Sequence, residues 1–429
     1  MSNTRPKKTA IVIGTGAGGG IMARELQGKY QVTVLEAGKE FKPFSLSIQR
    51  MANLRRSGIF FDERLIRLLL PNMLVEKSQE MVMVRGIGLG GTTTLATGNA
   101  VRYDGAIKDL GIDLDAQFEE LYQELPITTD HQKYWTKTTK KMYNLFEKMG
   151  LDPIVTPKLL NAPKCVGCGH CAIGCPTGAK WDTRTFVEQA VKKGTKLVTG
   201  CKVTDLKITG KSVTGVHTRH NGKKATFHAD LVVLAAGGLG TPIILENSGI
   251  PCSRTLFVDP VLCVAGPLPG LRQDRQLLMP FISQQDGYIL SPYMDYLSFF
   301  FNKDWRLPMQ NLASIMIKLA DEEVGSTNGK KIDKNMTAAD QSRMNKAVLQ
   351  SREILIRMGV PVDRQFLGTL NAGHPGGMLP LTAAEKDTLH NPVLPDNLYV
   401  ADATILPKAM GNPPILTIMA LAKKIAGIV

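Results

Sequence analysis

Four cysteines lie close together in the middle of the chain. Cys165, Cys168, Cys171 and Cys175, with Pro176 following, have the spacing C-x2-C-x2-C-x3-C-P. This spacing is typical of bacterial ferredoxins, where short loops let several thiolates converge on one iron–sulfur cluster. The run therefore predicts that the four thiolates bind an iron–sulfur cluster, most simply of the 4Fe–4S type.

The cluster type and the complete ligand set are left open by the sequence. In two-cluster ferredoxins the fourth cysteine of such a run binds the other cluster, and this chain has no second run. Either Cys175 completes the same cluster, or one of Cys201, Cys252 and Cys263 does, or a 3Fe–4S cluster forms. Four thiolates would also suit a structural zinc ion.

A glycine-rich turn near the N-terminus has the pattern of a dinucleotide site. Gly14, Gly16 and Gly19 form G-x-G-x-x-G, and Glu36 follows 22 residues after Gly14. The first glycine permits a tight turn, the second lets the backbone approach a pyrophosphate, and the third lets a helix pack closely on a strand. The carboxylate would accept hydrogen bonds from a ribose diol. These residues predict a dinucleotide without distinguishing FAD from NAD.

The elements around this turn alternate between strand and helix. The pattern predicts a strand over residues 9–14, a helix over 21–30 and a second strand over 31–38, which together form one parallel βαβ unit. The apolar run 231–236, followed by two glycines, predicts another buried parallel strand. These strands would place the glycine turn at the carboxyl edge of a parallel sheet.

The remainder of the chain divides into three blocks. Residues 111–160 are polar and predicted to be mostly helical, whereas residues 255–370 are rich in Met and aromatic side chains. Within the second block, residues 337–359 have the periodicity of a long amphipathic helix. The chain returns to a strand, turn and helix pattern over residues 397–429.

Three further motifs are spaced along the chain: RGIGLGGTTTLATGNAVR at 85–102, LAAGGLGTPIILENSGI at 234–250 and NLYVADATILPKAMGNPPILTIMALA at 397–422. With the glycine turn, they make the chain resemble the glucose–methanol–choline (GMC) oxidoreductase family, and its cholesterol oxidase branch is the most similar by motif. The resemblance is weaker across residues 255–360. It implies that the dinucleotide is FAD.

The resemblance also implies an α/β fold in which a discontinuous, Rossmann-type FAD-binding domain carries an inserted α+β substrate domain. We assign residues 1–110, 160–254 and 370–429 to the FAD-binding domain, with an iron–sulfur loop at 163–180, residues 111–159 to a helical insertion, and residues 255–369 to the substrate domain.

The family pattern further implies the residues that bind FAD. The expected set consists of Gly14, Gly16, Gly19, Glu36 and Val203 for the ADP half, Gly90, Gly91, Thr92 and Asn99 beside the flavin, and Ala236, Asp402, Ala403 and Pro413. Some relatives attach FAD covalently through a histidine in the second of these segments. No histidine lies between Arg85 and Arg102, so we expect non-covalent FAD.

Two residues match the catalytic pair that faces the flavin in this family, namely His374 in LNAGHPGGM and Asn412 in GNPPILT. Oxidising an alcohol removes a hydroxyl proton and a hydride, so a neutral imidazole would take or position the proton and the amide would hold the substrate oxygen. The structural alternatives are a turn-stabilising role for His374 and a helix N-cap for Asn412, with Pro413 as the first helical residue. Relatives usually carry one more residue between the proline and the glycine pair after this histidine, which leaves the orientation of His374 open.

A flavin and a cluster in one chain indicate the direction of electron flow. A flavin accepts two electrons as hydride, whereas a cluster passes them singly. We therefore expect a dehydrogenase that oxidises a CH–OH group, in an apolar alcohol, and passes the electrons through the cluster to an external one-electron carrier or a redox partner subunit. The alternatives are a reductase that acts on a ketone or an activated C=C bond, and an electron-relay subunit of a larger redox complex.

Charge and hydropathy limit the partners and the location. The net charge of +14 favours an acidic partner, but no nucleic-acid recognition motif accompanies it, so nucleic acid is not expected. No apolar run is long enough to span a bilayer and no secretory signal is visible, which predicts a cytoplasmic protein. The apolar segment 58–74 contains two arginines and favours either a buried helix beneath the active site or an interfacial helix in peripheral membrane contact.

Overall fold

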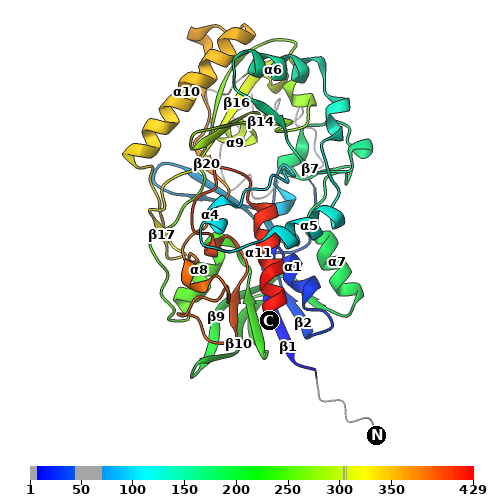
Figure 1. The fold of residues 1–429 in the computed structure, drawn as a ribbon, viewed down its shortest axis with the longest axis vertical. Helices are drawn as coiled ribbons and strands as arrows, with labels where there is room; N and C mark the ends of the chain where they lie inside the picture. The colour runs from blue at the N-terminus through cyan, green and yellow to red at the C-terminus, as the bar shows by residue number, and fades with distance from the viewer. Residues whose placement is uncertain (1–6, 44–69, 303–304, 306) are drawn as a thin grey trace.

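The computed structural model describes residues 7–43, 70–302, 305 and 307–429. It is an α/β structure in which a parallel sheet and a larger, mostly antiparallel sheet occupy opposite ends of the molecule (Figure 1). The parallel sheet carries the glycine turn, and the larger sheet forms much of the wall of the candidate active site.

The parallel sheet has five short strands that pair in register. Ile13 at the end of β1 aligns with Leu35 of β2 and with Leu234 of β12, so the strands end together at one edge. This sheet confirms the Rossmann-type fold and the three strands predicted for it. In sheet order the strands are β21 (Leu398–Val400), β12 (Leu231–Leu234), β1 (Thr9–Ile13), β2 (Gln31–Leu35) and β8 (Lys196–Val198).

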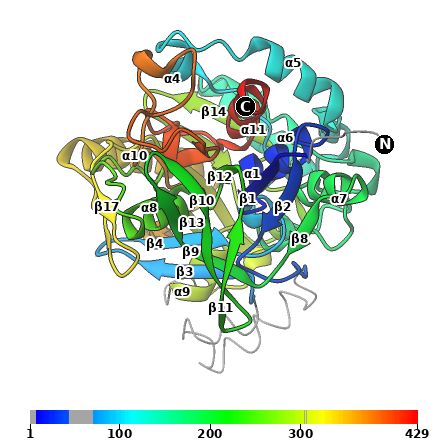
Figure 2. The same cartoon turned by 90° about the horizontal axis from the view of Figure 1, so that it is seen from below.

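Helices and a small sheet pack on these strands. The helix α1 (Ala17–Glu25) follows the glycine turn and packs against α7 (Arg184–Lys192) and the C-terminal helix α11 (Ile415–Ile428). The side chains of α11 are buried along most of its length, which explains its strongly apolar sequence. An antiparallel sheet of β9 (Cys201–Thr209), β10 (Ser212–His220) and β11 (Lys223–His228) contacts β2 and β12 and lies beside α8 (Gly237–Asn247) (Figure 2).

The larger sheet has nine strands that come from distant parts of the chain. Apart from the parallel pair β4 and β20, its strands pair antiparallel, and β19 pairs with β13 beside the main order. Its strands are β3 (Met73–Lys77), β4 (Val82–Gly86), β20 (Asn371–Ala372), β13 (Val261–Pro267), β16 (Leu312–Leu319), β15 (Tyr288–Pro292), β14 (Phe281–Gln285), β6 (Pro153–Val155) and β19 (Phe366–Leu367).

The long helix α10 (Ala338–Met358) packs against β13 and β16 of this sheet, and its bounds confirm the predicted amphipathic helix. Thr337 and Asp340 form a reciprocal capping box at its start, and Gly359 ends it in the left-handed conformation. Local capping residues therefore define both ends of this helix.

The segment predicted to be mostly helical contains the helices α5 (Asp115–Glu124) and α6 (Lys137–Lys148). It also contributes β6 to the larger sheet, which the sequence pattern did not indicate. The remaining short elements are α4 (Gly105–Lys108), α9 (Tyr296–Phe301), β5 (Ile127–Thr128), β7 (Lys158–Leu159), β17 (Ser326–Thr327) and β18 (Ile332–Asp333). The proposed domain boundaries stay a prediction. The strands β3, β4 and β20, which we assigned to the FAD-binding domain, join the same sheet as β13, β14, β15 and β16 of the substrate domain.

No helix in the described ranges is long and apolar enough to cross a bilayer. The candidate interfacial or buried helix predicted at 58–74 lies, up to residue 69, outside the described residues.

Candidate active site

The glycine turn has the conformation that a dinucleotide site requires. Gly14 has a φ of +99°, and a Cβ atom at this position would lie 2.3 Å from the carbonyl oxygen of Ala235. Gly16 differs, because a Cβ built on it would meet nothing within 4 Å. No side chain caps the N-terminus of α1 at Gly16. An uncapped helix N-terminus beside open space suits a phosphate group, so the turn fits the pyrophosphate of FAD.

Glu36 lies at the end of β2 and is 5% exposed. Its carboxylate accepts hydrogen bonds from the backbone N–H and hydroxyl of Thr15 and from the N–H groups of Gly38 and Gly88. Burial nevertheless raises the pKa of Glu36 above its usual value. Glu36 lies next to the glycine turn, and its expected role toward a ribose stays a prediction. Val203 lies on β9, whose first residue, Cys201, donates its N–H to the carbonyl oxygen of Glu36 over 2.9 Å.

The segment that follows β4 packs directly on this turn. Gly90 donates its N–H to the hydroxyl of Thr15 over 3.0 Å, and a Cβ on Gly91 would lie 3.0 Å from the Cα of Gly16. The hydroxyl of Thr92 accepts from the N–H of Gly86. The structure therefore brings the second predicted FAD segment against the first.

The remaining predicted FAD residues near this turn are Ala236, Asp402 and Ala403. The buried carboxylate of Asp402 accepts from the N–H of Gly237 at 2.8 Å and from the hydroxyl of Thr241 at 2.5 Å. Ala236, at the start of α8, donates its N–H to the same hydroxyl. Ala403 follows Asp402 in a short 3-10 turn. Asp402 thus ties the N-terminus of α8 to the segment that follows β21.

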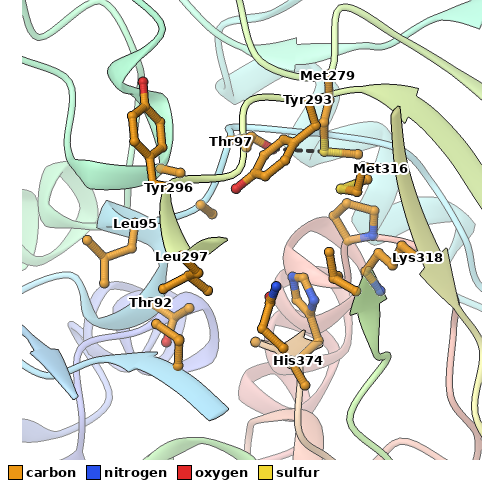
Figure 3. Close-up of a pocket in the computed structure, with 18 of the residues that line it drawn as sticks. Thr92, Leu95, Thr97, Met279, Tyr293, Tyr296, Leu297, Met316, Lys318 and His374 are labelled. Atoms are coloured by element: carbon orange, nitrogen blue, oxygen red, sulfur yellow. Dashed lines mark hydrogen bonds between the residues drawn. The ribbon is translucent and has the colours of Figure 1, made fainter. Parts of the chain in front are cut away.

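A cavity of about 130 Å³ lies between this nucleotide region and the larger sheet. Figure 3 shows Tyr293, Tyr296, Lys318 and His374 around one central space. The predicted residues Thr92, Asn99 and Pro413 also line it. Most of its wall is apolar and includes Met73, Val84, Leu95, Ala172, Ile173, Val261, Met279, Leu297, Met316 and Ile415.

His374 borders this cavity two residues after the end of the short strand β20. Its ring atom Nδ1 is buried, and no hydrogen-bond partner for it is found among the described residues. Burial lowers the pKa of His374 well below its usual value, and the nearby positive charge of Lys318 is a second, smaller cause in the same direction. The imidazole is therefore neutral, as an acceptor of a hydroxyl proton must be.

Asn412 is completely buried beside the cavity-lining residue Pro413. Its amide Nδ2 donates to Oε1 of Gln284 over 2.8 Å, while its Oδ1 has no partner in the described part of the chain. The expected N-cap role is wrong, because α11 begins at Ile415 and its N-cap is Pro414. The proline pair delays the helix, so Asn412 is held in the preceding turn, and it is not among the residues that line the cavity.

The cysteine loop lies against the same cavity. Ala172 and Ile173, which follow Cys171, form part of the cavity wall. The hydroxyl of Tyr296, another wall residue, donates to the carbonyl oxygen of Gly169 within the loop. The structure thus places the loop and the predicted catalytic histidine on one cavity, which the sequence did not establish.

The cysteine thiols differ in their surroundings. Burial raises the pKa of Cys165 and Cys168. Burial also acts to raise the pKa of Cys175, but hydrogen bonds from Thr177 and from nearby backbone N–H groups lower it below its usual value. None of the seven cysteines forms a disulfide. Within the described residues, no three Cys, His, Asp or Glu side chains form a group that could hold a metal ion, so the predicted cluster is not confirmed.

Two buried lysines near this loop were missed in the sequence. Lys158 donates to Oδ1 of Asn99 and to the carbonyl oxygen of Leu278, and Lys180 donates to main-chain carbonyl oxygens that include that of Cys171. Neither forms an ion pair with a described carboxylate. Burial lowers the pKa of Lys158 to about 7 and that of Lys180 to about 8. Nothing in their sequence context distinguishes them from surface lysines.

Comparisons with known proteins agree with this architecture. The family model described as GMC oxidoreductase matches residues 9–261, and the model described as FAD dependent oxidoreductase matches residues 182–425. Among solved structures, pyridoxine 4-oxidase from Mesorbium loti has a TM-score of 0.72 at 17% identity and covers 98% of both chains. A formate oxidase from Aspergillus oryzae has a TM-score of 0.71 at 13% identity and covers 99% of this chain and 98% of its own. These low identities establish the fold alone.

Curated relatives extend over most of the chain. An uncharacterized protein of Methanocaldococcus jannaschii is 26% identical over 423 residues, which are 96% of this chain and 97% of that protein. A long-chain-alcohol oxidase of Arabidopsis thaliana is 23% identical over an alignment of 512 residues, which covers 96% of this chain. The match spans 65% of the plant protein, less than two thirds of its length. From the family match over more than half its length, the chain belongs to the GMC oxidoreductases and is an FAD-dependent enzyme of the class that acts on CH–OH donors.

Proposed function

We propose that this enzyme oxidises an apolar alcohol in the cavity that His374 borders. The observation that carries the proposal is the neutral imidazole, whose Nδ1 has no partner among the described residues, on the wall of an apolar cavity next to the predicted flavin segment. FAD, which the glycine turn and Glu36 would hold by its ADP half, supplies the hydride acceptor when it is bound.

The protein groups in and beside the cavity have separate roles toward the substrate. His374 accepts the hydroxyl proton at Nδ1, because burial and Lys318 keep this ring unprotonated. Asn412 orients the substrate oxygen, since one of its two amide N–H bonds is not used by Gln284 and its Oδ1 is unpaired. The apolar wall excludes water from the reacting groups, which strengthens these interactions.

The lining of the cavity supports an apolar substrate. The methionines at 73, 279 and 316 supply flexible apolar contacts, and leucines and tyrosines complete the wall. The similarity to a long-chain-alcohol oxidase from a plant is in keeping with an aliphatic chain. We therefore propose a primary alcohol with an aliphatic chain as the substrate class.

We further propose that electrons leave through the cysteine loop to an external one-electron carrier. The four cysteines of the loop would hold a 4Fe–4S cluster, whose chemistry is single-electron transfer. The donor set supports this proposal, because backbone N–H groups point at the sulfurs of Cys165, Cys168 and Cys175. The net charge of +14 favours an acidic carrier.

The two buried lysines support an anionic centre at this place. An ammonium group buried without a counter-charge costs several kcal/mol. Lys158 and Lys180 form no ion pair with a described carboxylate, yet both are close enough to Cys171 to feel its thiolate charge. A cluster bound by four thiolates would carry a negative charge and would serve as the counter-charge for the two lysine ammonium groups.

The test is anaerobic mixing of the purified FAD-loaded enzyme with dodecanol, followed by flavin absorbance. We expect the wild type to lose its oxidised-flavin absorbance, and His374→Gln to do so about 10²- to 10⁴-fold more slowly with FAD still bound. His228→Gln, which changes an exposed histidine on β11, serves as the matched control. Equal rates for His374→Gln and the wild type would remove the catalytic assignment.

A further inference from the structure

A buried ion pair adjoins the cavity on the side of His374. Lys318 on β16 contacts the carboxylate of Asp259, and the two side chains are 2% and 1% exposed. Lys318 itself lines the cavity, whereas Asp259 lies behind it, just before β13. A buried pair of this kind gains little net stability, because desolvation of both charges opposes their attraction. Net stability alone therefore does not account for an ion pair in this apolar strand.

The pair holds the main chain on both sides of Asn412. Oδ1 of Asp259 accepts from the N–H of Gly411 at 3.0 Å, and Nζ of Lys318 donates to the carbonyl oxygen of Asn412 at 3.3 Å. Asp259 adopts a positive φ of 50°, a conformation that a residue other than glycine rarely takes. Asp259 thus makes its contacts from a backbone conformation that costs free energy.

The ammonium end of the pair also faces the imidazole. Figure 3 shows Lys318 and His374 on the same side of the cavity. The other titratable side chains on the cavity wall are Arg85, Tyr293 and Tyr296, and Arg85 is paired with Glu76 at 2.9 Å. Lys318 is the charged residue whose field acts directly on His374.

We propose that Lys318 and Asp259 are positioning residues, which fix the turn that carries Asn412 and place a positive charge beside His374. The inference rests on the roles proposed above for His374 and Asn412. It assigns to one ion pair both the orientation of the amide and the protonation state of the imidazole.

A second buried pair provides a matched control. Lys334 contacts Asp321 at 2.7 Å, and both side chains are fully buried. Asp321 accepts from the N–H groups of Val258 and Asp259, but no hydrogen bond joins this pair to the turn of Asn412 within the described residues. Loss of either lysine therefore leaves a buried aspartate without its partner, whereas only Lys318 contacts the predicted catalytic turn.

The experiment compares Lys318→Met with Lys334→Met in the FAD-loaded enzyme. The two readouts are the rate of flavin reduction by dodecanol and the imidazole nitrogen chemical shifts of His374 against pH, assigned by the signal lost in His374→Gln. We expect Lys318→Met to slow reduction about 10- to 100-fold and to move the His374 titration to higher pH, since a nearby positive charge is removed. We expect Lys334→Met to change both readouts less than Lys318→Met does, because Asp321 acts on the turn only through its hydrogen bond to Asp259 and its charge near Lys318.

The outcomes separate this inference from the proposed function. If Lys318→Met keeps the wild-type rate of flavin reduction and the wild-type His374 chemical shifts while His374→Gln is inactive, the positioning role is overturned and the proposed function stands. Equal slowing by Lys318→Met and Lys334→Met would also overturn it, because a general loss of stability would then explain both. Full turnover by His374→Gln would instead remove the proposed function. If Lys318→Met does not fold, Asp259→Asn combined with Lys318→Met removes both charges together and is judged by the same two readouts.

Discussion

The hydroxyl of Tyr296 donates to the carbonyl oxygen of Gly169 over 2.7 Å, and this bond fastens the cysteine loop to the wall of the cavity. Tyr296 begins the short helix α9, and Gly169 lies between Cys168 and Cys171. A Cβ on Gly169 would lie 2.7 Å from the carbonyl oxygen of Asp274, so the loop fits closely at this point. The position of the loop beside the cavity therefore depends on a small number of identifiable contacts.

Tyr296→Phe tests this attachment. Loss of the hydroxyl leaves the buried carbonyl of Gly169 without its donor and lowers the free energy of unfolding by about 1 kcal/mol. Tyr288→Phe is the control, because its hydroxyl donates to Gln350 on α10, away from the loop. We expect faster amide hydrogen exchange over residues 165–175 in Tyr296→Phe alone. Equal exchange of this segment in the two variants would contradict the attachment.

Alanine substitutions at Gly14 and Gly16 separate folding from FAD binding. Gly16→Ala places its methyl group in open space, so we expect a normal fold but FAD affinity lowered about tenfold or more, because that space would hold the pyrophosphate. Gly14→Ala combines a φ of +99° with the overlap at Ala235, and we expect its free energy of unfolding to fall by about 1–3 kcal/mol. FAD titration and denaturant unfolding measure the two effects. Unchanged FAD affinity in Gly16→Ala would contradict the assigned phosphate position.

His131 makes the stability of the protein depend on pH. It is 3% exposed, its Nδ1 accepts from the indole N–H of Trp135 at 3.1 Å, and its Nε2 donates to the carbonyl oxygen of Thr156 at 2.8 Å. Burial lowers the pKa of His131 to about 4. Between this value and the ordinary histidine pKa of about 6.5, the unfolded chain takes up a proton that the folded chain refuses. The stability that the neutral ring contributes is present above about pH 6.5 and is lost as the pH falls toward 4.

His131→Gln removes this pH dependence. In the wild type we expect this residue to lower the free energy of unfolding by about 3 kcal/mol between pH 6.5 and pH 4. Denaturant unfolding at a fixed FAD concentration across this range measures the effect, with His228→Gln as the control at an exposed site. A slope against pH that is the same in His131→Gln and the wild type would show that the ring is not the cause.

Local sequence signals predicted much of the fold. The strand β12 is a continuous apolar run before two glycines, β1 leads into the glycine turn, and β2 alternates polar and apolar residues. The helix α10 carries both of its capping signals, so each of these elements could be located from neighbouring residues alone. The larger sheet could not be predicted in this way. Strands such as β6 and β20 are two or three residues long and are held by partners far away in the chain, and no local pattern records such pairing.

The candidate site shows the same division. The glycine turn, Glu36 and the motifs around His374 could be recognised because their chemistry restricts the residue types at fixed spacings. The alternative of Asn412 as the N-cap of α11 is wrong, because the two prolines shift the helix start to Ile415, and its catalytic role stays a prediction. Lys318 and Lys158 gave no sequence signal, since only the tertiary structure buries them among apolar side chains.

The central claim is that electrons from an alcohol pass to a centre held by the cysteine loop. The most direct measurement is an anaerobic titration of the purified enzyme with dodecanol, followed by optical and paramagnetic-resonance spectra with iron, sulfide and zinc quantified in the same sample. We expect about four iron and four sulfide per chain, loss of the oxidised-flavin absorbance and a resonance signal from the reduced cluster. Zinc in place of iron, or a flavin that bleaches without any such signal, would contradict it.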